Sequence, residues 1–295
     1  MSQLDGPRGL MEQMMGHFPA LDPLFCSPLS PTDGPRTLAV ALAYNGSAFK
    51  GWQVQPGLPT VQGLLEGVLE RICGHRIRIV GAGRTDSGVH ALGQVASFAT
   101  TSALPAATIH RALNALVPPE IVIRAVVDTP VQFHARYSAR AKTYYYYLWP
   151  NAGPGLFMRG LCWVLPGKVE FEPMEQALEL LVGELDMKAF STGPLKPGAS
   201  SVRIVSEARI EQLPHGLWRV VITASGFLRH VVRNLVGSLV QVGRGKLPPQ
   251  ALVEMARARQ RLVPGPKAPP GGLYLARVYY SEDPLRPSTA ERTPS

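Results

Sequence analysis

One short glycine-rich stretch, GAGRTDSGVH at residues 81–90, contains residue types that can do chemistry. Asp86 lies two residues after Arg84 and two before Gly88, so a tight bend would expose a carboxylate beside a guanidinium. A neighbouring cation favours the ionised form of a carboxylate. An ionised carboxylate cannot be a general acid, but it can be a nucleophile or a general base. The stretch therefore indicates a reactive aspartate at residue 86.

Two other interpretations of this stretch compete with catalysis. In an Asx-turn, the Asp86 side chain would only cap its own loop, and the flanking glycines would supply positive φ. Gly81 and Gly83 also match the start of a dinucleotide-binding loop, which needs a third glycine where Asp86 stands. A carboxylate at that position would repel phosphates. The pattern argues against a nucleotide cofactor and leaves the turn and the catalytic aspartate open.

A run of four tyrosines, Tyr144 to Tyr147, falls in an expected strand over residues 133–150. The period of a strand sends Tyr144 and Tyr146 to one face and the other two to the opposite face. Either one pair fills the core and the other lies at the surface, or one ring stacks on an unpaired base. The basic residues upstream, which suit a path for phosphates, are Arg136, Arg140 and Lys142.

The expected helix over residues 226–243 carries two arginines at the edge of its apolar stripe. Arg229 and Arg233 would either extend into solvent or bring one guanidinium to the site to pair with Asp86. His230 points away from the stripe and is expected at the surface. The stripe consists of Leu228, Val231, Val232, Leu235, Val236 and Leu239.

Alternating strands and helices must position these residues. Thr60 is placed to cap a helix at 60–75, and Pro105 to begin one at 105–116. Helices that interrupt hairpin-connected strands predict an α+β fold, with helices on one face of mostly antiparallel sheets. We expect a disordered extension at 1–35, two α+β halves at 36–132 and 133–281, and a disordered tail at 282–295. Further helices are expected at 173–183 and 249–259, and strands at 36–44, 76–83, 93–100, 120–127, 201–213, 217–225 and 272–280.

The composition narrows the function classes. Thirty basic and 21 acidic residues give a formal charge of +9 over 295 residues, which favours an anionic partner, nucleic acid ahead of a membrane. The three cysteines form no CxxC pair, and neither a bilayer-spanning run nor a secretion signal is evident. A reducing, cytoplasmic setting is expected. Motifs for zinc deamination, two-metal chemistry, serine hydrolysis and phosphate-binding loops are missing.

Several segments resemble the tRNA pseudouridine synthase A family, and they do so in the family's order. AGRTDSGVHALGQVASF (82–98) resembles its signature, and the combination with the GFLRHVVRNLVG helix (226–237) is specific. The resemblance covers about residues 36–281. The other matching segments are YNGSAFKGWQ (44–53), FHARYSA (133–139), the tyrosine run, SVRIV (201–205) and PPGGLYL (269–275).

The resemblance implies a role for several residues. The family's catalytic aspartate falls on Asp86, its base-stacking tyrosine on Tyr144, and the arginine that pairs with the aspartate on Arg233. Arg84 matches an arginine thought to displace the target nucleotide, and Leu273 an apolar residue on the other side of the base. Thr143 departs from the family pattern, because many members carry a basic residue at this position. Supporting residues within the same motifs are Gly83, Thr85, Gly88, His90 and Arg203.

The resemblance also implies a fold and an activity. The fold would be two ferredoxin-like, RRM-like halves whose sheets join into a central sheet, with an active-site cleft between them. The activity would be isomerisation of uridine to pseudouridine at positions 38, 39 and/or 40 of the tRNA anticodon stem-loop, without cofactor or metal. Asp86 would either add covalently to the substrate or remove a ribose proton. The implied partners are tRNA and a second copy of the chain, in a homodimer.

Two rival classes remain for comparison. A non-catalytic RNA-binding α+β module would not require Asp86 or Arg233, and its usual RNA-recognition consensus is missing. A uridine methyltransferase would need a cofactor loop, which the sequence does not contain.

Overall fold

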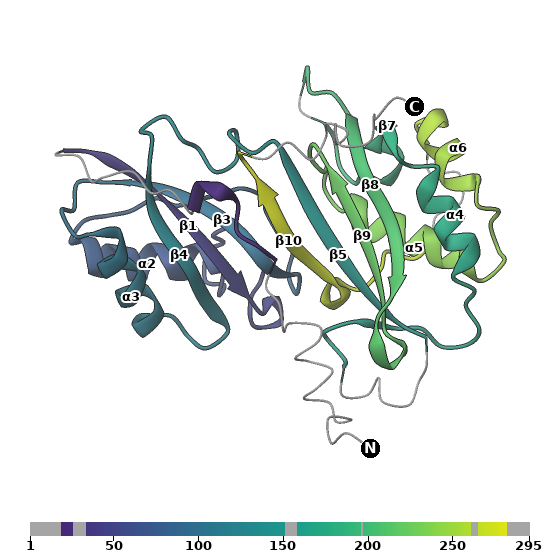
Figure 1. The fold of residues 1–295 in the computed structure, drawn as a ribbon, viewed down its shortest axis with the longest axis horizontal. Coiled ribbons are helices and arrows are strands. Elements are labelled where there is room, and N and C mark those ends of the chain that lie inside the picture. Colours follow the sequence, from purple (N-terminus) through teal and green to yellow (C-terminus); the bar gives the residue numbers. More distant parts are fainter. Residues whose placement is uncertain (1–18, 26–33, 151–157, 196, 261–264, 282–295) are drawn as a thin grey trace, which may run out of the picture.

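The computed structural model describes residues 19–25, 34–150, 158–195, 197–260 and 265–281. They form an α+β fold around one large mixed sheet (Figure 1). The strands are β1 (Arg36–Tyr44), β2 (Val80–Gly81), β3 (His90–Thr100), β4 (Ile121–Thr129), β5 (Ala141–Trp149), β6 (Trp163–Val164), β7 (Gly183–Asp186), β8 (Val202–Gln212), β9 (Trp218–Ala224) and β10 (Leu273–Tyr279).

The sheet joins an N-terminal set of strands to a C-terminal set. Its order is β4-β1-β3-β10-β5-β9-β8-β7, with β2 paired to β3 and β6 to β5. The joint is the parallel pair β3–β10, in which Tyr274 lies beside His90. The main path is otherwise antiparallel. The strands β4, β1 and β3 on one side of this joint and the five strands on the other side therefore share one continuous backbone hydrogen-bond network.

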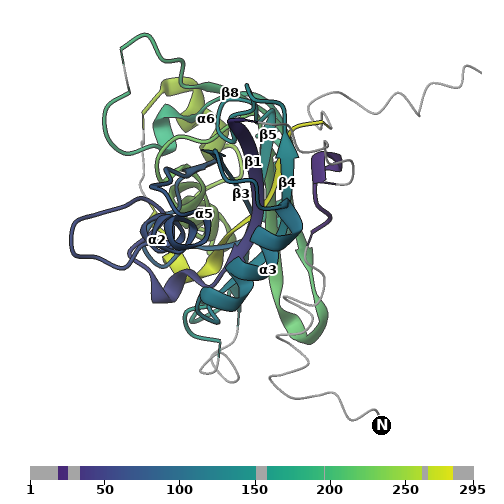
Figure 2. The same cartoon turned by 90° about the vertical axis from the view of Figure 1, so that its left-hand side faces the viewer.

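The helices are α2 (Val61–Cys73), α3 (Ala106–Leu116), α4 (Glu172–Glu179), α5 (Val231–Gly243) and α6 (Ala251–Ala258). Figure 2 shows α2, α5 and α6 on one side of the sheet. The Thr60 side chain accepts a hydrogen bond from the Gly63 amide at 3.3 Å, and α3 starts directly after Pro105. The predicted α+β class and both helix starts are confirmed.

Residues 19–25 lie against the opposite side of the sheet (Figure 2). Asp22 is 2% exposed, and its carboxylate accepts from the backbone amides of Tyr280 at 2.8 Å and Leu24 at 3.0 Å. Arg124 of β4 donates to the Pro19 carbonyl at 2.7 Å. The sequence expectation put all of residues 1–35 outside the folded body, and these seven residues depart from it. The rest of that segment up to residue 33, and the expected tail at 282–295, lie outside the described residues.

The central position of β5 gives its tyrosines two buried environments. Tyr144 and Tyr146 face the main core, on the side of the helices. Tyr145 and Tyr147 face a second cluster that contains Tyr274 on the other side of the sheet. The predicted alternation is present. Because apolar clusters cover both faces of β5, neither pair simply lies at the surface.

Three expected elements are shorter than their periodicity indicated. The strand expected over residues 133–150 is β5, and residues 133–140 lie outside it. Residues 76–79 alternate between exposed arginines and buried isoleucines, but ladder pairing begins only at Val80, which faces outward instead of inward. The helix expected from residue 226 begins at Val231, because His230 has φ 65° and a left-handed residue cannot continue a right-handed helix. The first residues of this segment therefore do not follow the helical period.

Candidate active site

The loop that carries Asp86 is anchored to β1 and β3. Thr85 is buried, and its hydroxyl is 2.8 Å from the Tyr44 hydroxyl. The carbonyl of Thr85 accepts from the Trp52 amide at 3.0 Å, and the carbonyl of Gly83 from the Gln94 side chain at 2.9 Å. These bonds fix the backbone on both sides of residue 86, so the carboxylate is presented from a rigid loop.

The Asp86 carboxylate pairs with α5. Its Oδ2 lies 3.4 Å from Nη1 of Arg233, whose Nε donates to the Ala268 carbonyl at 2.7 Å. The Asp86 side chain is 32% exposed and the Arg233 side chain 9%. The predicted pairing of Arg233 with Asp86 is confirmed. Among the described residues, no backbone amide donates to this carboxylate, so the Asx-turn interpretation does not apply.

His230 also contacts Asp86, which the sequence interpretation missed. Its Nε2 lies 3.2 Å from the same Oδ2, and its side chain is only 12% exposed. The expectation of a surface histidine is wrong, because His230 lies just before α5 in a left-handed conformation and the helical wheel does not apply to it. Once the helix is known to begin at Val231, the proximity is explained, because His230 is its N-cap residue and Arg233 lies in its first turn.

The environment of His230 favours its neutral form. Burial lowers the pKa of His230, and the charge of Asp86 partly opposes this effect. The positive charges of Lys267, Arg229 and Arg233 lower the pKa further. A neutral imidazole can donate a hydrogen bond through one nitrogen and accept one through the other.

Tyr144, a residue of β5, lies beside the loop that carries Asp86. Its ring packs edge-to-face on Phe227, with centroids 4.9 Å apart. Its hydroxyl is 3.7 Å from the position that a Cβ on Gly83 would occupy. Burial raises the pKa of Tyr144, and the charges of Tyr44 and Asp86 add to this effect. The phenol therefore stays protonated at neutral pH.

Leu273 is buried at the start of β10. In the β10–β5 ladder it lies opposite Tyr146, and the next residue on the same face, Leu275, lies opposite Tyr144. Leu273 therefore lies on the same face of the sheet as Tyr144, two residues along β10 from the partner of that tyrosine, and its side chain is only 6% exposed.

Positive charges surround the loop. Arg84 is exposed, and Lys142 lies beside Gly83, with its Cε 3.6 Å from the position of a Cβ there. Burial lowers the pKa of Lys142 to about 8, and the charges of Arg136 and Arg203 contribute. Arg203 donates to the carbonyls of Ser200 and Val202 at 2.8 and 2.6 Å. We define the cationic rim as Arg84, Arg136, Lys142, Arg203, Arg229 and Lys267.

Gly88 and His90 hold the end of the loop and do not contact Asp86. Gly88 has φ +77°, and a Cβ there would come within 3.1 Å of Pro270. The His90 ring stacks on Tyr274 with centroids 4.5 Å apart. Its Nδ1 accepts from the Gly46 amide at 3.1 Å, and its Nε2 donates to the Gly160 carbonyl at 2.8 Å. Burial lowers the pKa of His90, which fits this neutral tautomer.

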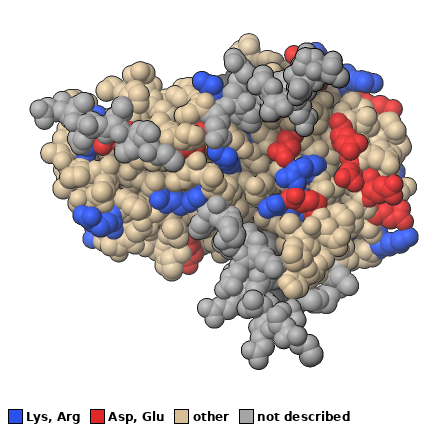
Figure 3. All heavy atoms as spheres, in the orientation of Figure 1, with Lys and Arg blue, Asp and Glu red and all other residues tan. Residues whose placement is uncertain are grey.

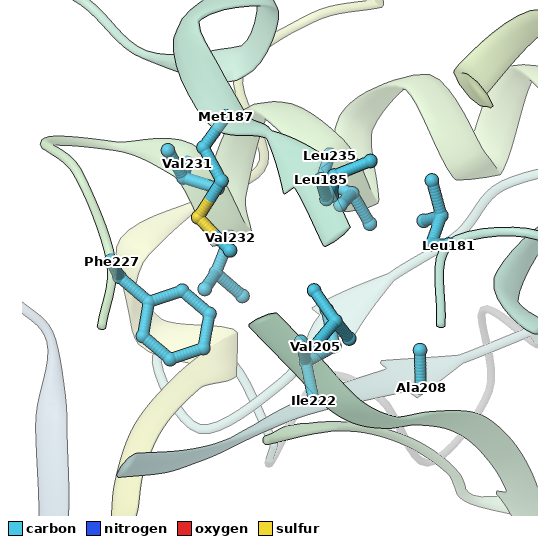
Figure 4. Close-up of a pocket in the computed structure, with 10 residues that line it drawn as sticks. All are labelled: Leu181, Leu185, Met187, Val205, Ala208, Ile222, Phe227, Val231, Val232 and Leu235. Carbon is cyan, nitrogen blue, oxygen red and sulfur yellow. The ribbon is translucent and has the colours of Figure 1, made fainter. Parts of the chain in front are cut away.

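The described residues also form a small pocket away from Asp86. Figure 4 shows a small pocket lined only by apolar side chains, including Phe227, and none of the residues of the Asp86 site lines it. The described residues contain no group of three His, Cys, Asp or Glu that could hold a metal ion. They also contain no helix long and apolar enough to cross a membrane.

The opposite face of the sheet has a different charge pattern. Over β8 and β9, basic and acidic side chains lie next to one another (Figure 3). Arg209 pairs with Glu207 at 2.7 Å and with Glu211, which also pairs with Arg219. These cations pair with carboxylates within the protein, whereas Arg136 and Arg203 act on another cation, Lys142, and Arg229 and Lys267 act on His230.

Comparisons with known proteins find one family along most of the chain. The family model described as tRNA pseudouridine synthase matches residues 40–138 and 177–281. The chain is 41% identical to tRNA pseudouridine synthase A of Moorella thermoacetica, over 82% of this chain and 99% of that protein. It is 40% identical to the one of Geobacillus kaustophilus (82% and 93%) and 35% identical to the one of Caldicellulosiruptor bescii (83% and 100%).

Proposed function

The chain belongs to the tRNA pseudouridine synthase family, and we propose that it modifies positions 38, 39 and/or 40 of the tRNA anticodon stem-loop with Asp86 as the reacting group. It is an isomerase that converts uridine in tRNA to pseudouridine. The reaction breaks the C1′–N1 glycosidic bond, turns the uracil and forms a C1′–C5 bond. C5 loses a proton and N1 gains one, so atoms and electrons balance within the nucleotide.

One observation carries the role of Asp86. Its carboxylate is partly exposed, yet the nearly buried guanidinium of Arg233 holds one of its oxygens. A nearby guanidinium stabilises the anion and fixes its direction. Asp86 as an anion would either add covalently to the substrate or take a proton from the ribose. Both routes need the same ionised, aimed carboxylate.

Tyr144 and Leu273 would hold the uracil. The target uridine must leave its stack, which costs a few kcal/mol that stacking and phosphate contacts return. Tyr144 lies beside the Asp86 loop, so its ring can stack on the base. To take the C5 proton at the end, its hydroxyl, which burial keeps protonated, would have to pass its own proton on at the same time. Leu273 would contact the other side of the base, and the exposed Arg84 would help to displace the nucleotide.

The tRNA would bind along the cationic rim. Contacts to phosphates supply most of the affinity of such complexes and weaken as salt rises. The unbalanced charges beside Asp86 support this placement, in contrast to the paired charges over β8 and β9. We propose that a homodimer binds the anticodon arm across both copies.

The site would lie in a cleft between two ferredoxin-like halves. Asp86 follows β2 in the N-terminal part of the chain, whereas Tyr144 and Arg233 come from β5 and α5 in the C-terminal part. The β3–β10 pair joins these two parts. A site assembled from both parts in this way supports the proposal of a cleft.

The test is conversion of unmodified tRNA by the purified protein without added cofactor, with pseudouridine detected by chemical labelling. The wild type is expected to modify uridines 38–40. Asp86→Asn is expected to lose at least a thousandfold in rate and to keep tRNA binding within about threefold, because only the reacting charge is removed. Full turnover by Asp86→Asn would overturn the role of this residue. Wild-type binding without conversion would instead indicate a non-catalytic RNA-binding protein.

A further inference from the structure

We propose that His230 is a positioning residue which, with Arg233, holds Oδ2 of Asp86 so that Oδ1 is the oxygen offered to the substrate. The inference rests on the proposed reacting role of Asp86. It adds to that role a second partner and the identity of the reacting atom.

Both contacts reach the same oxygen. Nε2 of His230 is 3.2 Å and Nη1 of Arg233 is 3.4 Å from Oδ2 of Asp86. Within the described part of the chain, no hydrogen bond or ion pair reaches Oδ1. Rotation of the carboxylate about its last torsion would break both contacts at once. The side chain as a whole is 32% exposed, and we expect a substrate to approach the oxygen that has no protein contact.

The partner of the other ring nitrogen sets the tautomer of His230. Nδ1 of His230 pairs with the hydroxyl of Thr192, a residue that also donates its backbone amide to the Arg229 carbonyl at 3.1 Å. An ionised carboxylate only accepts hydrogen bonds, so Nε2 must carry the proton. The Thr192 hydroxyl then donates to Nδ1. In this tautomer His230 is a neutral donor that directs Asp86 without adding a second positive charge.

The charged groups around the ring keep it in that state. Arg229 precedes it in sequence, Arg233 lies on the first turn of α5, and Lys267 comes from the segment before β10. Their positive charges and the burial of the ring oppose a second proton more strongly than Asp86 favours it. A charged histidine would form a stronger hydrogen bond to Oδ2 of Asp86 than a neutral one. It would thereby withdraw charge from the carboxylate and make Oδ1 less reactive.

The backbone at His230 supports a role for its side chain. A φ of 65° costs a non-glycine residue roughly 1–2 kcal/mol, and asparagine or glycine tolerates it best. The left-handed turn aims the imidazole at Asp86 instead of along α5. Strain at such a position is often found where a side chain serves a site.

The test compares His230→Asn with His230→Gln. Asparagine suits the left-handed backbone, but its amide ends near the place of Nδ1 and cannot reach Asp86. Glutamine places an amide donor near the position of Nε2. In single-turnover reactions with saturating protein, His230→Asn is expected to be about 10- to 100-fold slower, the usual effect of losing a hydrogen bond to a charged group, with its Kd for tRNA unchanged. His230→Gln is expected to stay within about threefold of the wild type.

The outcomes separate this inference from the proposed function. Equal rates for His230→Asn and the wild type would overturn it, and so would equal losses in both variants, which would indicate only a need for the ring. Thr192→Val should slow the reaction about 3- to 10-fold, and Thr192→Ser should restore it, because only serine returns the hydroxyl to Nδ1. No conversion by the wild type would instead defeat the proposed function.

A structure of the complex with an anticodon stem-loop RNA tests the identity of the reacting oxygen. We expect Oδ1 to be the carboxylate oxygen nearest the ribose of the target uridine, with both protein contacts kept on Oδ2. A ribose nearest Oδ2 would overturn the assignment.

Discussion

At the level of single residues, Lys142 is an unusual lysine in the cationic rim. It lies beside Gly83, and Arg136 and Arg203 repel its charge while burial removes water from it. Together these effects lower its pKa from 10.5 to about 8. A phosphate placed there would relieve the repulsion, so RNA binding and protonation of Lys142 should favour one another.

The affinity for tRNA should therefore fall as pH rises. Between pH 7 and 9 the free protein loses the Lys142 proton, and the Kd for tRNA should rise roughly 3- to 10-fold in a filter-binding titration. Lys142→Arg keeps its charge throughout and should flatten this dependence. Lys142→Met should bind weakly at both pH values. An unchanged pH dependence in both variants would rule out Lys142 as its source.

Folding stability should change with pH in the opposite direction to the affinity for tRNA. Because the folded pKa lies below the unfolded one, the unfolded chain binds more protons between about pH 8 and 10.5, and stability rises with pH there. The charge of Lys142 therefore destabilises the fold at neutral pH. Lys142→Met should raise the free energy of unfolding at pH 7 while it weakens tRNA binding, measured by denaturant titration.

At the level of elements, the backbone of the segment before α2 packs against the backbone of the Asp86 loop. Gly51 has φ +95°, and a Cβ there would lie 2.8 Å from the Thr85 carbonyl oxygen and 3.2 Å from the Asp86 carbonyl carbon. The next residue, Trp52, donates its amide to the same Thr85 carbonyl at 3.0 Å. The position of the loop therefore depends on the missing side chain of Gly51.

Gly51→Ala should displace the loop and slow turnover more than tenfold, because the carboxylate would move relative to Arg233. Gly57→Ala is the matched control, since Gly57 also has positive φ (+70°) but a Cβ there would meet nothing within 4 Å. Both variants should lose about 1 kcal/mol of stability from the left-handed backbone. Equal turnover in the two variants would contradict this role of Gly51.

The start of α5 shows the limit of periodicity within an element. The apolar period predicted the core-facing stripe and put Arg233 at its edge, where the structure finds it paired with Asp86. The same period put His230 at the surface, which is wrong, because the chain is not helical at that residue. A period describes only the residues that share regular φ and ψ.

At the level of the whole molecule, Asp22 ties the segment 19–25 to the residues that follow β10, the last strand. Its carboxylate accepts from the amides of Tyr280 and Ser281, which follow β10, and from that of Leu24. This contact lies on the side of the sheet opposite the helices (Figure 2). It concerns the fold and leaves the Asp86 site untouched.

Asp22→Ala should lower the free energy of unfolding by about 2–3 kcal/mol, because buried amides would lose their acceptor. The rate of single-turnover pseudouridine formation at a temperature well below unfolding should not change. Glu184→Ala, at an exposed glutamate, is the control and should alter neither quantity by much. A loss of rate in Asp22→Ala without loss of stability would place this residue in the function instead.

The sequence by itself determined the α+β class, most helix and strand positions and the Asp86 motif. It left open whether Arg229 or Arg233 reaches Asp86, and only the family resemblance assigned this role to Arg233, 147 residues away. Regular elements repeat a local pattern, and the motif is contiguous, so both can be read along the chain. Only the tertiary structure decided that His230 contacts Asp86, that Lys142 is crowded by two arginines, and that Asp22 is buried. These three depend on irregular backbone and on neighbours far away in sequence, which no local period encodes.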